Sequence, residues 1–119
     1  MLNSLDACSR VYLACGSTDM RKSIDALAAL VNQDFQLDLF SNSLFVFCNE
    51  GRDKLKILYW DHNGFWLYYR RLERGRFRWP KRSDSQTLSV SRRQLGWLLD
   101  GLTLDQHKAH KPVTERVIV

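Results

Sequence analysis

The dipeptide Asn63-Gly64 stands between two runs of strand-forming residues, KLKILYWDH at 54–62 and FWLYYRRL at 65–72. An Asn-Gly pair in this setting is the strongest local signal of a β-hairpin, because a type I′ turn needs positive φ at both central residues. We therefore expect two antiparallel strands joined by a two-residue loop. The register that follows pairs His62 with Phe65, Trp60 with Leu67, Tyr59 with Tyr68, Leu58 with Tyr69 and Ile57 with Arg70.

Large apolar side chains occur on both faces of this hairpin. A strand pair that is apolar on both faces is covered twice, so we expect a helix on one face and another element or a partner on the other. Large aromatic patches on a small sheet often mark an interface. The residues predicted to bind a partner are Trp60, Trp66, Tyr68 and Tyr69.

Two helices are predicted from apolar spacing and capping residues. One stripe of helical period predicts a helix over about 18–34. A capping box formed by Ser91 and Gln94 opens a second helix over about 91–101. The first stripe consists of Met20, Ile24, Leu27, Ala28, Val31 and Phe35, and the candidate N-caps before it are Ser17, Thr18 and Asp19. Further strands are predicted at 10–15, 43–49 and 87–90.

The turn after the hairpin is predicted at 73–75. RFRW at 76–79 alternates cations with aromatic residues and is predicted to be another strand. A loop of two to four residues then places Arg78 opposite Arg70 or Arg71. Like charges directly opposite each other are destabilising, so we expect an acidic side chain or a bound anion between them.

These elements predict an α+β fold in a single domain over residues 1–104. It would contain a mostly antiparallel sheet of about five or six strands, with one helix packed on a face and a C-terminal helix. Residues 105–119 show little periodicity, and we expect a flexible tail. We expect no membrane span and no secretory signal. The three cysteines form no metal-binding or disulfide pattern, which favours a reduced, cytoplasmic protein.

Positive charge is concentrated in residues 70–82, RRLERGRFRWPKR. Seven of these thirteen residues are cationic and one is acidic, whereas the rest of the chain has eleven Lys and Arg against twelve Asp and Glu. Arginine presents a rigid fork of donors that matches phosphate oxygens, so we favour a nucleic-acid surface over a solvated sheet edge. The predicted phosphate contacts are Arg70, Arg71, Arg74, Arg76, Arg78, Lys81 and Arg82.

Two aromatic residues, Phe77 and Trp79, lie among these cations. Exposed rings between cations can stack on unpaired bases, but we favour a place in the core for both. Arg21 and Lys22 oppose the dipole at the start of the first predicted helix. Their position suggests either an ion pair with the sheet or a second phosphate contact.

No motif in the chain supports catalysis or a cofactor. The glycines form no phosphate-binding loop, and His107 and His110 have no third metal ligand nearby. Carboxylates could hold paired magnesium ions for DNA cleavage, but the candidates form no acidic constellation. These candidates are Asp19, Asp25, Asp61, Asp84 and Asp100. We therefore expect no enzyme, no metal and no cofactor.

Two stretches, TDMRKSIDALA at 18–28 and KLKILYWDHNGFWLYYRRLERGRFRWP at 54–80, carry a family resemblance. With LFVFCN and LSVSRRQLGWLLDGL, they resemble the TnpB (second open reading frame) accessory protein of the insertion-sequence-sixty-six family of bacterial transposable elements. The resemblance covers about residues 10–104. The chain departs from the pattern at Cys15, Ser17 and Ser23.

This resemblance implies a role in DNA transposition beside a larger transposase that carries the catalytic residues. Our first hypothesis is a non-catalytic accessory factor that binds DNA, at transposon ends or nonspecifically, through the cations of 70–82 with Arg21 and Lys22. The alternative is a protein–protein adaptor that docks on the transposase or self-associates through its aromatic residues. The two hypotheses are compatible, because a basic patch and an aromatic patch can lie on opposite sides.

Overall fold

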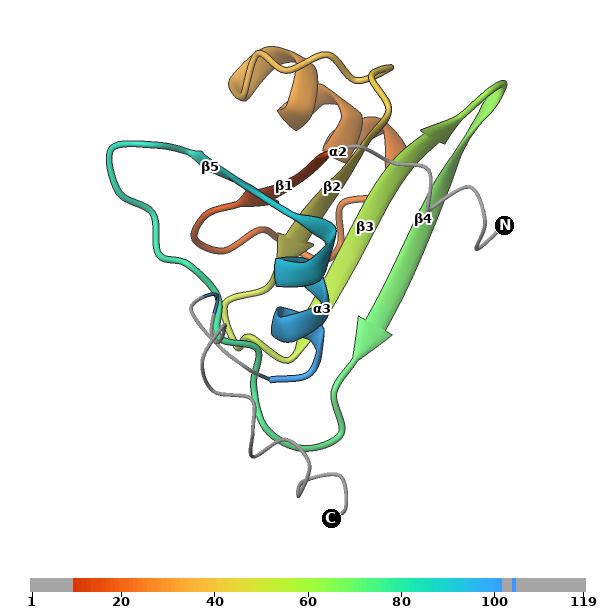
Figure 1. Cartoon of the computed structure of the whole chain (residues 1–119). Coiled ribbons are helices and arrows are strands. Elements are labelled where there is room, and N and C mark those ends of the chain that lie inside the picture. The colour runs from red at the N-terminus through yellow and green to blue at the C-terminus, as the bar shows by residue number, and fades with distance from the viewer. Residues whose placement is uncertain (1–9, 102–103, 105–119) are drawn as a thin grey trace.

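The computed structural model of the chain describes residues 10–101 and 104. Five strands form one sheet in the order β4-β3-β2-β1-β5 (Figure 1). β1 and β2 run parallel, and the other neighbouring pairs are antiparallel, which confirms the predicted α+β class and the mostly antiparallel sheet. The elements are β1 (Arg10–Ala14), α2 (Ile24–Ala29), the π-helical turn η1 (Leu30–Asp34), β2 (Ser43–Cys48), β3 (Lys54–Asp61), β4 (Gly64–Arg71), β5 (Thr87–Val90) and α3 (Arg92–Leu99).

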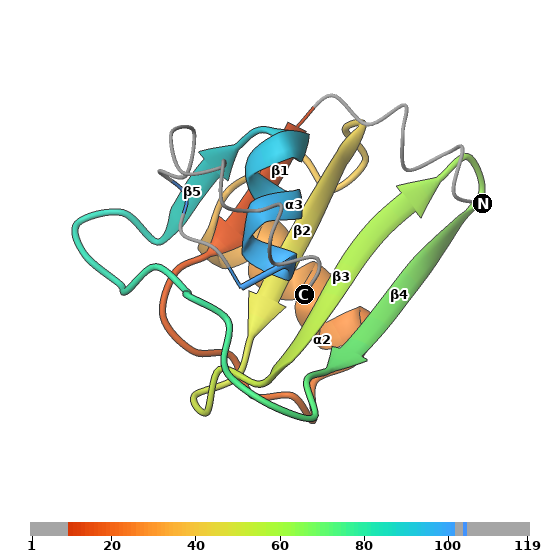
Figure 2. The same ribbon diagram turned by 60° about the horizontal axis from the view of Figure 1, so that its bottom comes forward.

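The two helices pack on opposite faces of this sheet (Figure 2). Every residue of β2 is buried, because this central strand is covered on both sides. On the α2 face the buried residues are Ala14, Leu27, Val31, Phe45, Phe47 and Leu58. On the α3 face they are Val11, Leu13, Leu44, Val46, Cys48, Leu55, Tyr59, Phe77, Trp79, Val90, Leu95 and Leu98.

The β3–β4 hairpin forms as predicted, but its predicted register is wrong by two residues. Asp61 pairs with Gly64 and Trp60 with Phe65, so the two-residue loop is His62-Asn63. His62 takes the left-handed conformation, with φ of 63°. A shift of two residues leaves every side chain on the same face of the sheet, and apolar patterning therefore cannot distinguish the two registers.

The first helix begins at Ile24, so its predicted start at residue 18 is wrong. The reason lies in β3: Lys56 Nζ donates to the carbonyl oxygens of Met20 and Lys22, each at 2.8 Å. These oxygens would otherwise accept the first hydrogen bonds of a longer helix. Ser23 is instead the N-cap, and the predicted N-caps Ser17, Thr18 and Asp19 all lie before the helix.

The end of this helix and the whole of α3 agree with prediction. The helical segment ends in η1 at Asp34. At α3 the backbone N–H of Gln94 donates to Ser91 Oγ, and Ser91 N–H donates to Gln94 Oε1, which confirms the capping box. No helix among residues 10–101 combines the length and apolar character needed to cross a bilayer. The expected tail at 105–119 lies outside the described residues.

Residues 76–79 do not form a strand, contrary to prediction. They belong to an irregular segment, residues 72–86, that runs between β4 and β5 at one end of the sheet and that we name the strap. The predicted opposition of Arg78 to Arg70 or Arg71 is therefore absent. Arg71 instead lies across from Lys54 and forms an ion pair with Glu73 at 3.0 Å, so a carboxylate does relieve the nearest repulsion between like charges.

Candidate functional site

The strap is irregular but firmly attached to the sheet. Its hydrogen bonds go to the end of β1 and the loop that follows it, and to the turn between β2 and β3. These bonds run from Leu72 N to Asp53 O (2.7 Å), Phe77 N to Arg52 O (2.7 Å), Trp79 Nε1 to Ala14 O (2.9 Å), Gly16 N to Pro80 O (3.0 Å) and Cys15 N to Gln86 O (2.9 Å).

Side chains in the strap point alternately into the core and into solvent. Phe77 and Trp79 are 1% and 7% exposed and belong to the α3-side core, whereas Arg76 and Arg78 are exposed. The predicted core position of both rings is thus confirmed. Because the rings are buried, they cannot stack on bases, and the outer side of this stretch presents guanidinium groups.

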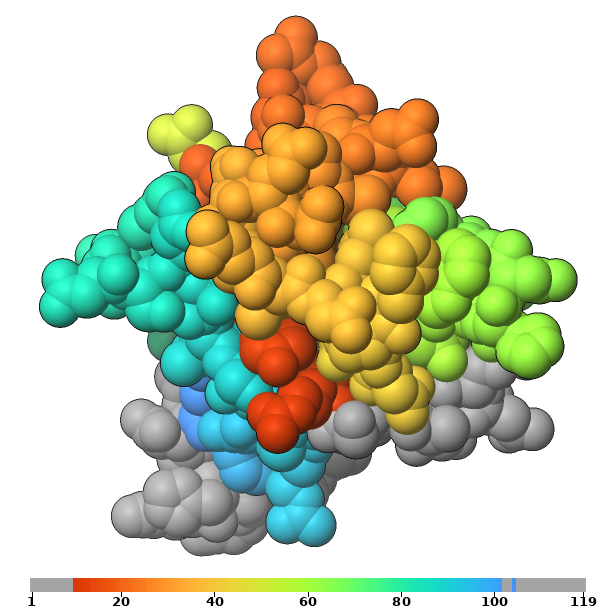
Figure 3. Space-filling view, turned by 90° about the horizontal axis from the view of Figure 1, so that it is seen from above, coloured from red at the N-terminus to blue at the C-terminus, as the bar shows by residue number. Residues whose placement is uncertain are grey.

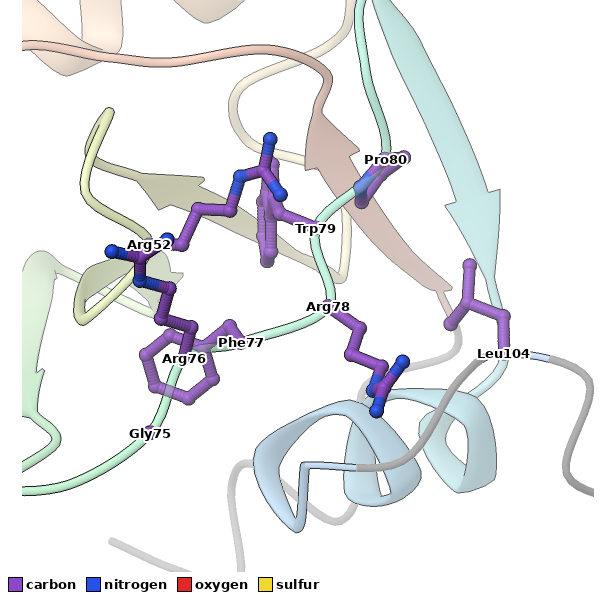
Figure 4. A pocket seen from close by; sticks show the side chains of 8 residues that line it. All are labelled: Arg52, Gly75, Arg76, Phe77, Arg78, Trp79, Pro80 and Leu104. Atoms are coloured by element: carbon purple, nitrogen blue, oxygen red, sulfur yellow. The ribbon is translucent and has the colours of Figure 1, made fainter.

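Three arginines line a shallow surface depression of about 750 Å³. Arg76 and Arg78 come from the strap, and Arg52 comes from the turn between β2 and β3 (Figure 4). Phe77, Trp79 and Pro80 also line the depression. Five donors on each guanidinium and the apolar residues beside them make this a surface suited to a polyanion.

Two smaller depressions continue the series of cations. The second, of about 150 Å³, is lined by Arg52, Lys81 and Arg82 together with Glu50. The third, of about 140 Å³, is lined by Arg82 and Lys22 together with two carboxylates, those of Asp19 and Asp34. Arg52 lines the first two depressions and Arg82 the last two, so the three are contiguous.

Arg82 is held in place at the junction. The side-chain amide of Gln86 joins Arg82 to Asp34. The amide oxygen of Gln86 accepts a hydrogen bond from Arg82 Nη2 at 3.0 Å, and the amide nitrogen of Gln86 donates to Asp34 O at 2.8 Å. Gly16 faces Arg82: its φ is +78°, and a Cβ there would lie 3.3 Å from Arg82 Cβ. Burial raises the pKa of the Cys15 thiol, and the nearby Arg82 charge opposes that shift.

Carboxylates lie near several of these cations and balance those of the third depression. Asp53 accepts a hydrogen bond from Asn49 Nδ2 at 2.8 Å. This bond is the main cause of its lowered pKa, to which the charges of Lys54 and Arg76 also contribute. Asp19 and Asp34 line the third depression. Within residues 10–101 and 104, no group of three or more His, Cys, Asp or Glu residues is arranged to hold a metal ion.

The structure thus brings together Arg76, Arg78, Lys81, Arg82 and Lys22 from the predicted phosphate contacts, and leaves the others apart. Arg70 and Arg71 are exposed on opposite faces at the end of β4. Arg74 is exposed in the turn before Gly75. The remaining predicted contact, Arg21, pairs with a carboxylate and is described next.

Arg21 forms an ion pair with Asp19, with Nη2 and Oδ2 2.7 Å apart. Asp19 Oδ1 also accepts the backbone N–H of Arg21 at 2.9 Å. The side-chain and backbone hydrogen bonds from Arg21, with its charge, lower the pKa of Asp19 from 3.8 to about 2. The Asp19–Arg21 pair therefore stabilises the turn before α2.

The ion pair predicts a specific pH dependence. Because the folded-state pKa of Asp19 is depressed, its stabilising contribution is present above the unfolded pKa and is lost as pH falls from 3.8 through about 2. Arg21→Ala should return the titration midpoint of Asp19 toward 3.8. The carboxyl carbon shift of Asp19, followed by NMR, measures this midpoint, and equal midpoints in both proteins would contradict the assignment.

Sequence reasoning did not identify Arg52 as a member of the site. The predicted hairpin could have indicated the position of Arg52. Because β3 and β4 are antiparallel, the residues before β3 lie beside the residues after β4. This brings the turn that contains Arg52 next to the strap. Arg52 has a φ of 62°, and its carbonyl accepts the Phe77 N–H, so backbone and side chain both take part.

The four predicted partner-binding residues are divided between the two faces of the sheet. Trp66 and Tyr68 lie on the α3 face, and Trp60 and Tyr69 lie on the α2 face. Trp60 packs edge-on against Phe40, with ring centroids 4.9 Å apart. Figure 3 shows the gold loop before β2, which includes Phe40, against the green end of the hairpin.

The family model described as "IS66 Orf2 like protein" matches residues 9–109. Among curated proteins of Sinorhizobium fredii, the uncharacterized protein y4hO is 38% identical over 93 residues, covering 78% of this chain and 80% of its own length. The uncharacterized protein y4jC is 33% identical over 104 residues, covering 87% of each chain. No solved structure matches the chain.

Proposed function

Because the chain belongs to the IS66 Orf2-like family, we propose that it is a non-catalytic accessory factor of DNA transposition that grips the phosphate backbone of DNA. It acts in the bacterial cytoplasm beside a larger transposase, which supplies the chemistry. One observation carries the proposal: Arg52, Arg76 and Arg78 line a single open depression. Lys81 and Arg82 extend this cationic surface into a second depression, and Lys22 lies with Arg82, Asp19 and Asp34 at a third.

Phosphate recognition fits this surface better than small-molecule binding. The depression is shallow, and its three cations come from two separate loops that hydrogen bonds hold together. An extended polyanion can contact all of them at once, and contacts to phosphate position a protein on DNA without reading its sequence. Such binding weakens steeply with salt, because each neutralised phosphate releases condensed counterions.

Replacement of both strap arginines tests the proposal. At about 0.15 M salt, Arg76→Ala/Arg78→Ala should weaken duplex binding about 30-fold and reduce the slope of log affinity against log salt by about 1.8. Fluorescence anisotropy with a labelled duplex of about 20 base pairs measures both quantities. Unchanged affinity with an unchanged slope would reject the site.

A matched control removes the same charge elsewhere. Arg21 and Arg71 are exposed but paired with Asp19 and Glu73. Arg21→Ala/Arg71→Ala should therefore change affinity by less than about threefold, because each of these charges is already paired with a carboxylate. An equal loss in both double variants would indicate an effect of net charge alone.

A second candidate function is protein docking at the hairpin tip. Phe40 is 60% exposed and forms an aromatic cluster with Trp60 and Phe65. No cation takes part in these ring contacts, so the cluster suits an apolar surface of the transposase or of a second copy. Light scattering after size exclusion, alone and with the transposase, tests this; a monomer that never comigrates with the transposase excludes it.

A further inference from the structure

The α3 face of β4 carries a regular row of two aromatic residues and one cation. Trp66, Tyr68 and Arg70 are two residues apart and therefore share one face. Their cross-strand partners in β3 are Tyr59, Ile57 and Leu55, in that order. All three partners belong to the α3-side core or pack against it. The row thus lies beside apolar core residues of β3, and its side chains are spaced about 6.8 Å apart along the strand.

The two rings of this row lie nearly parallel, and Tyr68 is the less exposed of the two. Their centroids are 6.1 Å apart and their interplanar angle is 12°, so they are parallel and displaced along the strand. Trp66 Nε1 donates to Asp61 Oδ2 at 3.1 Å, which fixes the tilt of the indole. Trp66 is nevertheless 42% exposed. A ring held in this manner loses little conformational freedom when a planar ligand stacks on it.

No described helix covers this row. Figure 2 shows α3 across β1 and β2, with β4 at the side of the sheet away from the helix. The helix packs its buried residues Leu95 and Leu98 into the core on that face. β4 is also the outermost strand of the sheet, so an extended chain can reach the row from the side.

The charge of the row identifies the kind of ligand. Arg70 continues the line of the two rings, and the strap with its cations begins two residues later at Leu72. The carboxylate of Asp61 accepts the indole N–H of Trp66. Stacked rings followed by guanidinium groups match a chain that alternates planar bases with phosphates. A purely apolar protein surface would leave Arg70 without a counterpart.

We infer that Trp66, Tyr68 and Arg70 bind single-stranded DNA, with unpaired bases on the rings and a phosphate on the guanidinium. This inference rests on the proposed function, because it extends the same DNA contact from the strap onto β4. The protein then has two adjacent surfaces: a cationic one that holds phosphates of any DNA, and a stacking one that accepts only bases freed from pairing. Such a protein prefers a junction of duplex and single strand over either form alone.

Affinities of the full chain for three matched DNA ligands test the inference. The probes are a labelled 12-nucleotide single strand, its duplex, and a duplex with a 12-nucleotide overhang. Trp66→Ala should weaken single-strand binding about 5- to 150-fold, remove the preference for the overhang and leave duplex binding within about threefold. Tyr69→Ala is the matched control: Tyr69 is 54% exposed on the opposite face, and its loss should change no affinity by more than about threefold.

A conservative substitution separates stacking from structural damage. Trp66→Phe keeps an aromatic face and should retain most of the single-strand affinity, whereas a structural role for the indole hydrogen bond would make Phe and Ala equally harmful. Unchanged single-strand binding in Trp66→Ala, or equal losses for all three ligands, would overturn the inference. The proposed function would still stand if Arg76→Ala/Arg78→Ala weakens duplex binding. Tighter binding to RNA of the same sequence would overturn the assignment to DNA.

Discussion

Replacing Trp79 with alanine should lower the free energy of unfolding by about 3–5 kcal/mol, the largest effect on stability that we expect from one change in the strap. The indole is 7% exposed within the α3-side core, so its loss leaves a cavity. The change also removes the 2.9 Å hydrogen bond from Nε1 to Ala14 O, which ties the strap to β1. Urea unfolding followed by circular dichroism measures the difference.

Two further variants isolate the contributions of this residue. Trp79→Phe keeps most of the apolar volume and loses only the hydrogen bond, so it should cost about 1–2 kcal/mol. Trp66→Ala removes an indole that is 42% exposed and should cost less than Trp79→Ala. A Trp79→Ala protein as stable as the parent would show that the strap is not anchored as described.

Removing all three arginines of the large depression should weaken duplex binding about 150-fold at about 0.15 M salt and lower the salt slope by about 2.7. This loss corresponds to about 3 kcal/mol of binding free energy. The triple variant adds Arg52→Gln to Arg76→Ala/Arg78→Ala. Gln removes the charge but keeps an unbranched side chain at residue 52, whose backbone φ is 62°. Anisotropy titrations between about 50 and 200 mM salt give both quantities.

The contribution of Arg52 is the informative part of this comparison. Its guanidinium reaches the depression from another loop, so its effect depends on the folded arrangement and not on local charge density. If the triple variant binds no more weakly than the Arg76/Arg78 double variant, the binding surface is the charged segment itself and not the depression.

Signals confined to a few neighbouring residues predicted the structure well. The Ser91 and Gln94 capping box specifies the start of α3 through bonds three residues apart. The alternation of aromatic and charged residues in 76–79 correctly indicated which side chains are buried. It did not reveal that the backbone N–H of Phe77 bonds to a loop instead of a strand, because burial of alternate residues needs only an extended backbone.

Features that depend on distant parts of the chain were predicted incorrectly or missed. The start of α2 depends on Lys56, which lies 36 residues beyond the carbonyl of Met20. The position of the hairpin turn depends on ring contacts such as that of Trp60 with Phe65. Apolar patterning cannot distinguish the observed register from one shifted by two residues, because both place the same side chains on each face. Arg52 joins the site only because two antiparallel strands bring separate loops together.

The position of β1 in the sheet has a consequence for biosynthesis. This strand is synthesised before β5, which is one of its two neighbours, so Val11 cannot pair with Val90 until β5 has been made. Until then the apolar edge of β1 is open in the nascent chain, where it can pair with a wrong strand. Closing such a long loop is slow. The sheet should therefore be completed only after β5 has been synthesised.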